Sequence, residues 1–172
     1  SLTFERVVNG EVKSDTKNDY EKPVVQPYEK ADWQIVKVNE GDTLKLPEAK
    51  FTLSKDNNVV YTGTSDDQGI VRWVDNNNKP VACGKIAKGS YVLKETVAPR
   101  GYSLTTDTWT VEIGAEGMKP VIKEMKTNTP VELTQNPESS IYELKIKNMP
   151  VYDLPSTGGN GIYVYMIGGV AL

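Results

Sequence analysis

The chain has 172 residues, a length that favours one compact domain with attached segments and excludes a large multidomain enzyme. Hydrophobic residues make up 38% of it, and 23 acidic against 20 basic residues give a net charge of −3, so a basic nucleic-acid-binding surface is not expected. It contains no histidine, which excludes histidine-based triads and general bases, and its one cysteine, Cys83, cannot form an internal disulfide.

Residues 1–30 are expected to be the end of a preceding module followed by a linker. Residues 2–8 form a β-like run that reaches Asn9-Gly10, a pair typical of hairpin turns. The later part is polar and contains Pro23 and Pro27, a composition that favours an extended, poorly packed chain.

Residues 31–150 are predicted to form one β-sandwich domain. Short β-like runs alternate with turn residues such as Asn, Asp and Gly, and none has a sustained helical period. This spacing without intervening helices favours an all-β antiparallel sandwich. The predicted strands cover residues 33–38, 51–53, 59–61, 70–74, 91–97, 108–113, 121–125, 131–133 and 141–146.

Residues 151–172 differ from the rest, because a proline- and glycine-containing segment precedes an uncharged apolar run at residues 161–172. The run is too short to span a bilayer, which takes about 20 residues. On apolarity alone, it is either a buried element of the domain or the beginning of a transmembrane segment.

The pentapeptide before this run, Leu154-Pro155-Ser156-Thr157-Gly158, resembles the LPxTG sorting signal that sortases recognise in Gram-positive bacteria. Pro155 restricts the backbone to a shape that a groove can bind, and Gly158 leaves the Thr157 carbonyl open to a thiol nucleophile. The resemblance implies cleavage after Thr157 and transfer to an amine of peptidoglycan or of a neighbouring pilin subunit. It also favours a truncated hydrophobic segment for the apolar run, although the basic tail of the family's signal is missing.

A second motif lies at residues 91–102, with the sequence Tyr-Val-Leu-Lys-Glu-Thr-Val-Ala-Pro-Arg-Gly-Tyr. It resembles the E-box of the collagen-adhesin B-type (Cna B-type) domains of Gram-positive pilins and adhesins. Residues 46–53 are similar to another segment of that family, with Glu48 in place of a glycine. The resemblance implies an immunoglobulin-like sandwich.

Strand parity predicts three polar side chains on apolar faces, because alternate residues of a strand share a face. Lys37 shares parity with Trp33 and Ile35, Glu95 with Tyr91 and Leu93, and Asn148 with Leu144 and Ile146. Burying such groups without partners is costly.

These three side chains could react with one another. Burial disfavours the charged forms of an amine and a carboxyl group, so Lys37 could attack the Asn148 side-chain carbonyl while Glu95 transfers protons. The family resemblance implies the same Lys37–Asn148 isopeptide bond with Glu95 as its catalyst. The alternative is an ordinary buried ion pair between Lys37 and Glu95, with Asn148 hydrogen-bonded at a strand end.

Other residues carry weaker signals. Without histidine to activate it, Cys83 is expected to be a small buried side chain rather than a reactive thiol. Lys22 and Lys30 could link a neighbouring pilin subunit but are interpreted as solvated linker charges. Trp73 and Trp109 could mark a ligand surface or pack in the core.

The sequence therefore predicts an extracellular, wall-anchored stalk or anchor module of a pilin or surface adhesin, which is a sortase substrate and not an enzyme. No cofactor, metal or nucleic-acid partner is expected. An adhesin domain that binds a host extracellular-matrix ligand is the first alternative, since surface loops can encode binding that one sequence does not reveal. An enzyme acting on an external substrate is the second.

Overall fold

The computed structural model describes residues 2–8, 11–17, 32–154, 164–167 and 170–171, with side chains for residues 32–151. Lys22, Lys30 and residues 155–158 of the pentapeptide lie outside the described residues. Within the described part, the elements are strands and one short 3₁₀ helix, η1 (Cys83–Lys85).

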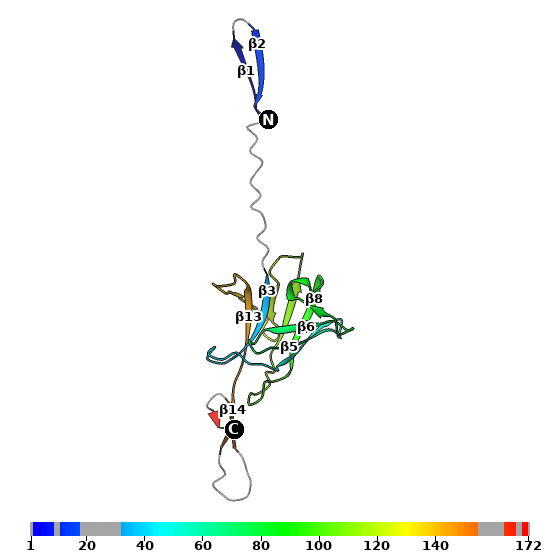
Figure 1. Ribbon diagram of the computed structural model, residues 1–172, viewed down its shortest axis with the longest axis vertical. Coiled ribbons are helices and arrows are strands. Elements are labelled where there is room, and N and C mark those ends of the chain that lie inside the picture. The colour runs from blue at the N-terminus through cyan, green and yellow to red at the C-terminus, as the bar shows by residue number, and fades with distance from the viewer. Residues whose placement is uncertain (1, 9–10, 18–31, 155–163, 168–169, 172) are drawn as a thin grey trace, which may run out of the picture.

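The central domain is built from an eight-stranded and a three-stranded sheet (Figure 1). The larger sheet is antiparallel throughout, with the strand order β11-β10-β9-β8-β4-β5-β6-β7. Its strands are β4 (Lys50–Lys55), β5 (Asn58–Ser65), β6 (Val71–Val74), β7 (Pro80–Val81), β8 (Gly89–Val97), β9 (Thr108–Ile113), β10 (Val121–Glu124) and β11 (Thr129–Val131). The all-β, immunoglobulin-like fold predicted from the sequence is confirmed.

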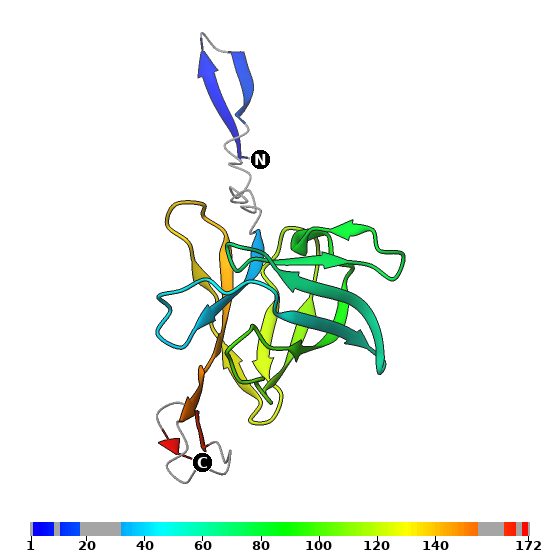
Figure 2. The same cartoon turned by 60° about the horizontal axis from the view of Figure 1, so that its bottom comes forward.

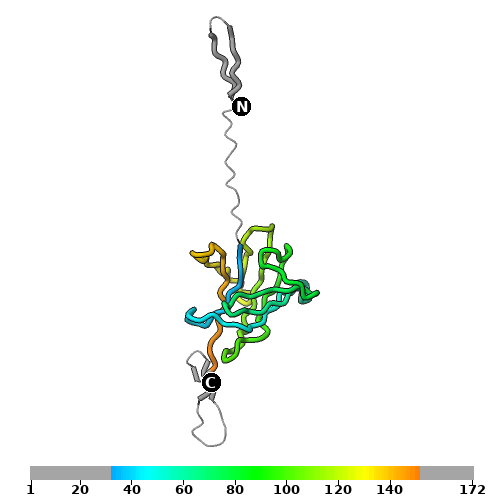
Figure 3. The backbone as a smooth tube through the Cα atoms, in the orientation of Figure 1, coloured from blue at the N-terminus to red at the C-terminus, as the bar shows by residue number. Residues whose placement is uncertain are grey.

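The smaller sheet joins strands from the two ends of the domain, in the order β12-β13-β3. Its strands are β3 (Trp33–Asn39), β12 (Thr134–Gln135) and β13 (Tyr142–Asn148). β13 runs antiparallel to β12 but parallel to β3, with Tyr142 opposite Trp33 and Asn148 opposite Asn39. The parallel pair, which the sequence did not predict, places the first and last strands of the domain side by side (Figure 3).

The core lies between the two sheets. Trp33 and Ile35 of β3 and Ile146 of β13 belong to the same buried cluster as Phe51 and Leu93 of the larger sheet. Alternation explains the inward faces of β8 and β13, whereas β3 is buried at four consecutive positions, residues 35–38. β3 is therefore covered on both faces, and any polar side chain on it needs an internal partner.

The terminal segments form small separate sheets. β1 (Leu2–Val8) pairs antiparallel with β2 (Glu11–Lys17), in agreement with the hairpin expected at residues 9–10. β14 (Val151–Leu154) pairs with β15 (Val164–Ile167), which pairs with β16 (Val170–Ala171). The described residues contain no helical segment with the length and apolar character that a membrane span requires.

Most predicted strands are found with longer or shifted ends. The predicted strand at residues 131–133 is displaced, since β11 ends at Val131 and β12 begins at Thr134, where the chain passes to the other sheet. Residues 131–133 therefore connect two sheets, a long-range property that local β propensity does not reveal.

Candidate functional site

Three polar side chains meet inside the sandwich, one from each of β3, β8 and β13. They are Lys37, Glu95 and Asn148, and their exposed fractions are 0%, 0% and 2%. They are the three residues that strand parity had placed on apolar faces. An acid, an amine and a carboxamide thus share one water-excluded space.

Glu95 lies between the other two side chains. Its Oε1 is 3.8 Å from Lys37 Nζ, an ion-pair distance. Asn148 Nδ2 donates hydrogen bonds to both carboxyl oxygens of Glu95, at 2.9 Å to Oε1 and 3.0 Å to Oε2. The carboxyl group of Glu95 therefore connects the amine to the carboxamide.

The amine of Lys37 has one further partner, since Nζ donates a 2.8 Å hydrogen bond to the backbone carbonyl of Ile146. Burial lowers the pKa of Lys37 from 10.5 to about 8, and the nearby Glu95 opposes this effect only in part. A pKa of about 8 leaves about one-tenth of the amine neutral at pH 7, far more than an exposed lysine has. This environment makes Lys37 a potential nucleophile.

A bulge in β8 directly follows Glu95. Phe51 of β4 is opposite Glu95 and Lys50 is opposite Val97, so no residue of β4 lies opposite Thr96 in the register. The bulge ends the alternation of β8, because Thr96 and Val97 are both exposed. Glu95 is thus the last inward-facing side chain of β8, next to an irregularity of the kind often found beside active sites.

The two polar atoms of the Asn148 side chain differ in their hydrogen bonding. Its Nδ2 has two partners, whereas its Oδ1 is buried and has no partner among the described residues. An unpaired buried acceptor costs about 1–3 kcal/mol. The orphaned carbonyl oxygen lies on the carbon atom that a nucleophile would attack.

The loop after β8 closes over the same end of the site. The backbone N–H of Thr105 donates to Glu95 Oε2 at 3.0 Å. Ser103 N donates to the Met149 carbonyl and Val151 N to the Gly101 carbonyl, both at 2.9 Å. These two backbone bonds tie the chain that leaves β13 to the loop that covers Glu95.

Backbone partners of the site could not be found by sequence reasoning. The Ile146 carbonyl and the Thr105 N–H carry no side-chain signal, and Thr105 is ten residues beyond Glu95 in a loop. The resemblance to the E-box marks residues 91–102 and stops just before Thr105.

The other candidate residues have structural roles. Cys83 is buried, and burial raises the pKa of its thiol to about 12, so it is not a thiolate nucleophile. Trp73 and Trp109 both belong to the core cluster. Leu154 ends β14, whereas Pro155, Ser156, Thr157 and Gly158 lie outside the described residues.

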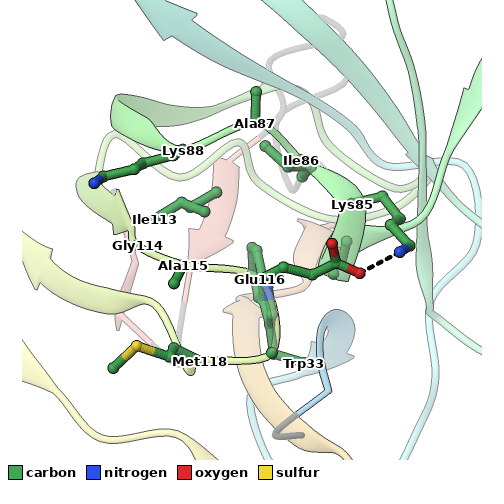
Figure 4. A pocket seen from close by; sticks show the side chains of 13 residues that line it. Trp33, Lys85, Ile86, Ala87, Lys88, Ile113, Gly114, Ala115, Glu116 and Met118 are labelled. Carbon is green, nitrogen blue, oxygen red and sulfur yellow. Dashed lines mark hydrogen bonds and ion pairs between the residues drawn. The ribbon is translucent and has the colours of Figure 1, made fainter.

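A separate cavity of about 230 Å³ lies at the end of the sandwich where β8 begins (Figure 4). Trp33, Ile113 and Met118 contribute to its wall, and an ion pair between Lys85 and Glu116 crosses its side. It is smaller than most small-molecule sites, which occupy about 300–1,000 Å³. The register of β8 and β9 places it at the opposite end from Asn148.

Comparisons with known proteins agree with the fold. The family model described as SpaA, prealbumin-like fold domain, matches residues 31–129. A C-terminal fragment of the pilus adhesin SpaC from Lactobacillus rhamnosus GG is similar at a TM-score of 0.50 and 20% identity, over 72% of this chain and 46% of that fragment. No curated protein sequence matches the chain.

Two further solved structures have lower TM-scores. The Bacillus anthracis TIE protein is 24% identical at a TM-score of 0.44, over 69% of this chain and 17% of that one. The group B streptococcus pilus 2b backbone protein is 20% identical at a TM-score of 0.34, over 80% of this chain and 47% of that one. This chain thus spans less than half of the length of each of these structures.

Proposed function

Because this chain belongs to the SpaA family of prealbumin-like fold domains, we propose that it is a structural stalk or anchor module of a Gram-positive pilin or surface adhesin. The module would be cross-linked internally by an isopeptide bond between Lys37 and Asn148, formed with the help of Glu95. The observation that carries this proposal is the meeting of these three buried side chains, with Glu95 in contact with both others.

The reaction balances without any co-reactant. The neutral Lys37 Nζ attacks Asn148 Cγ, and the new C–N bond forms as the carbonyl oxygen gains negative charge. The Cγ–Nδ2 bond then breaks, the carbonyl is restored, and ammonia leaves with a proton that came from Nζ. The products are one secondary amide and one ammonia.

Glu95 is suited to moving that proton. Its carboxyl group reaches both Lys37 Nζ and Asn148 Nδ2, the atoms that lose and gain the proton. If the carboxyl is protonated and the carboxamide turns over about its terminal torsion, the Glu95 hydroxyl can donate to Oδ1, the acceptor that otherwise has no partner. Such a hydrogen bond polarises the carbonyl for attack. Glu95 ends the reaction unchanged.

The bond would stabilise the fold by closing a long loop. Treated like a disulfide, a closed loop of about 110 residues contributes on the order of 4–5 kcal/mol, a model-dependent value. This reaction occurs once per chain and on the chain itself, so the proposed role is structural rather than enzymatic. A chain with one cysteine gains in this way a cross-link that disulfides cannot provide.

We also propose for this protein the domain layout and the cellular location that its sequence predicts. Residues 1–30 are the end of a preceding module and a linker, residues 31–150 the Cna B-type domain, and residues 151–172 an LPxTG-type signal with the start of a hydrophobic segment. Sortase would cleave after Thr157 and attach the chain to peptidoglycan or to a neighbouring pilin subunit. The protein would then be extracellular, on the cell wall or pilus.

Intact-mass measurement tests the cross-link directly. We expect the purified chain to be one ammonia lighter than its sequence requires, and a protease digest to contain a branched peptide that joins the Lys37 and Asn148 segments. Glu95→Ala should restore the full mass by removing the proton carrier, and Lys37→Ala by removing the nucleophile. Glu143→Ala, which removes a different buried carboxylate, on β13, is the matched control and should keep the lighter mass.

A wild-type mass equal to the sequence mass would contradict the isopeptide bond. Lys37 and Glu95 would then be a buried ion pair and Asn148 a hydrogen-bonded strand end. The family membership and the sandwich fold do not depend on this outcome.

A further inference from the structure

The distance between the folded domain and the pentapeptide is very short. Val151 is still attached to the domain through its hydrogen bond to Gly101, and Leu154 follows three residues later. Three residues span at most about 10 Å, even when fully extended. Leu154 is paired with Val164 in the small terminal sheet, and binding in an enzyme groove would replace this pairing.

An enzyme that binds residues 154–158 is much larger than this spacer. A domain of about 150 residues has a radius of gyration of about 15 Å. The rim of its groove must therefore lie against the end of the sandwich from which β14 emerges (Figure 2). Contact between the two folded bodies is imposed by chain length alone.

This end of the sandwich carries exposed apolar side chains. The register places the end of β8, the start of β9 and the end of β10 together, and the Asn148–Glu95 hydrogen bonds add the end of β13. We define the apolar end surface by the four exposed hydrophobic residues at or just beyond these strand ends: Val97, Leu104, Met125 and Met149.

Two features hold these side chains outward. The bulge at Thr96 turns Val97 to solvent, and the Ser103 N–H bond to the Met149 carbonyl joins the loop that carries Leu104 to the end of β13. Exposed apolar groups gathered at one place on a soluble domain are typical of interaction surfaces.

We propose that the apolar end surface is a docking site for the sortase that cleaves after Thr157, a second contact besides the pentapeptide itself. This inference rests on the proposed function, since it requires residues 154–158 to be a sortase substrate. The spacer length decides the occupant: whichever enzyme holds Leu154 lies within about 10 Å of Val151, two residues beyond Met149 of this surface. Docking there raises the local concentration of the pentapeptide at the groove and selects folded modules over free peptides.

The test compares cleavage of the full chain with cleavage of a synthetic peptide of residues 151–163. The probe is a purified sortase that cleaves free Leu-Pro-x-Thr-Gly peptides, with triglycine as the amine acceptor, and kcat/KM is measured for both substrates. We expect the full chain to be the better substrate by about tenfold or more, mainly through a lower KM. The double variant Leu104→Asp, Met149→Asp should lose this advantage.

Matched controls separate docking from folding. Val59→Asp, Val121→Asp changes two exposed apolar residues at the opposite end of the sandwich and should leave kcat/KM unchanged. Both double variants should melt within a few degrees of the wild type. An eight-residue Gly/Ser spacer before Leu154 should lower kcat/KM toward that of the peptide, because it loosens the imposed contact.

The outcomes distinguish the docking surface from the sorting signal. Equal kcat/KM for chain and peptide, or no effect of Leu104→Asp, Met149→Asp, would overturn the docking surface and leave the sorting signal intact. A spacer that raises kcat/KM would also overturn it, since the end surface would then obstruct the enzyme. Failure of both substrates to be cleaved after Thr157 would overturn the sorting signal itself, and the docking surface with it.

Discussion

The charge of Lys37 depends on folding. It is fully buried, and burial lowers its pKa from 10.5 to about 8 while Glu95 supplies only partial compensation. In a chain that cannot form the cross-link, such as Asn148→Ala, this difference makes stability depend on pH. Between about pH 8 and 10.5 the unfolded chain binds a proton at this residue that the folded chain does not.

We therefore predict that Lys37 adds up to about 3 kcal/mol to the free energy of unfolding of Asn148→Ala between pH 8 and pH 10.5, measured as the difference from the same variant without this lysine. Below pH 8 the amine is protonated in both states, and this contribution no longer changes. Urea unfolding across this range measures the slope. Lys37→Met in the same background is the control, and it keeps the opposing contributions of Cys83 and Tyr91, whose pKa values burial raises. Equal slopes in the two variants would mean that Lys37 keeps an ordinary pKa in the folded chain.

Glu48 shows how one substitution can strain a turn. The similar segment of the family has a glycine at this position. Glu48 has a φ of 65°, a left-handed conformation that costs residues other than glycine about 1–2 kcal/mol. Its side chain is exposed, and its N–H donates to the Ser65 carbonyl at 2.9 Å. The turn therefore depends on the backbone conformation of residue 48 and not on contacts of its side chain.

Replacing Glu48 with glycine is predicted to stabilise the domain by about 0.5–1 kcal/mol, since relief of strain exceeds the added flexibility of the unfolded chain. Thermal unfolding of Glu48→Gly beside Glu48→Ala measures the effect. Only the glycine variant should melt higher than the wild type. An equal rise in both variants would assign the gain to loss of the charge instead.

At the scale of elements, β3 is held by hydrogen bonds on both of its edges. β13 lies on one edge, and on the other edge Lys37 N donates to the Gly69 carbonyl at 2.7 Å while Leu46 N donates to the Lys37 carbonyl at 2.9 Å. Gly69 has a φ of 74°, and a Cβ atom there would be 2.5 Å from the Lys37 carbonyl oxygen. The turn can approach β3 only because residue 69 has no side chain.

We expect Gly69→Ala to destabilise the domain by about 2 kcal/mol or more, through left-handed strain and displacement of β3. Because the displaced segment carries Lys37, the fraction of chains that lose ammonia should also fall. Gly114→Ala is the matched control, since a Cβ atom there meets nothing within 4 Å. Chemical unfolding and intact mass report the two effects. A Gly69→Ala variant as stable and as fully cross-linked as Gly114→Ala would refute this account of how β3 is positioned.

Local pattern predicts individual strands of this domain well and their assembly poorly. β9 is found at its predicted bounds, Thr108–Ile113, and parity identified the buried Lys37, Glu95 and Asn148, because alternation is a property of one strand. The parallel pairing of β3 with β13 and the approach of Gly69 to Lys37 join segments far apart in sequence. Such contacts depend on the whole fold, so no local signal predicts them.

At the scale of the molecule, the proposed cross-link determines how tension passes through the domain. The described chain enters the sandwich at β3 and leaves it after β13, and these parallel strands are neighbours (Figures 1 and 3). A bond between Lys37 and Asn148 would carry force from the first strand to the last through covalent bonds alone. Residues 149–151 lie outside the closed loop, so their hydrogen bonds to Gly101 and Ser103 would break first.

Single-molecule pulling through attachment points before residue 32 and after residue 154 tests this force path. We predict that the wild type shows no large extension step, because residues 38–147 lie within the closed loop and bear no load. Glu95→Ala lacks the bond, so its domain should unfold in one step that releases about 110 residues, on the order of 350–400 Å of contour length. Glu143→Ala, the matched carboxylate variant, should behave as the wild type does. A full-length step in wild-type chains whose mass shows the loss of ammonia would mean that the cross-link joins residues other than Lys37 and Asn148, since a bond between these two strands leaves no path by which the enclosed segment can extend.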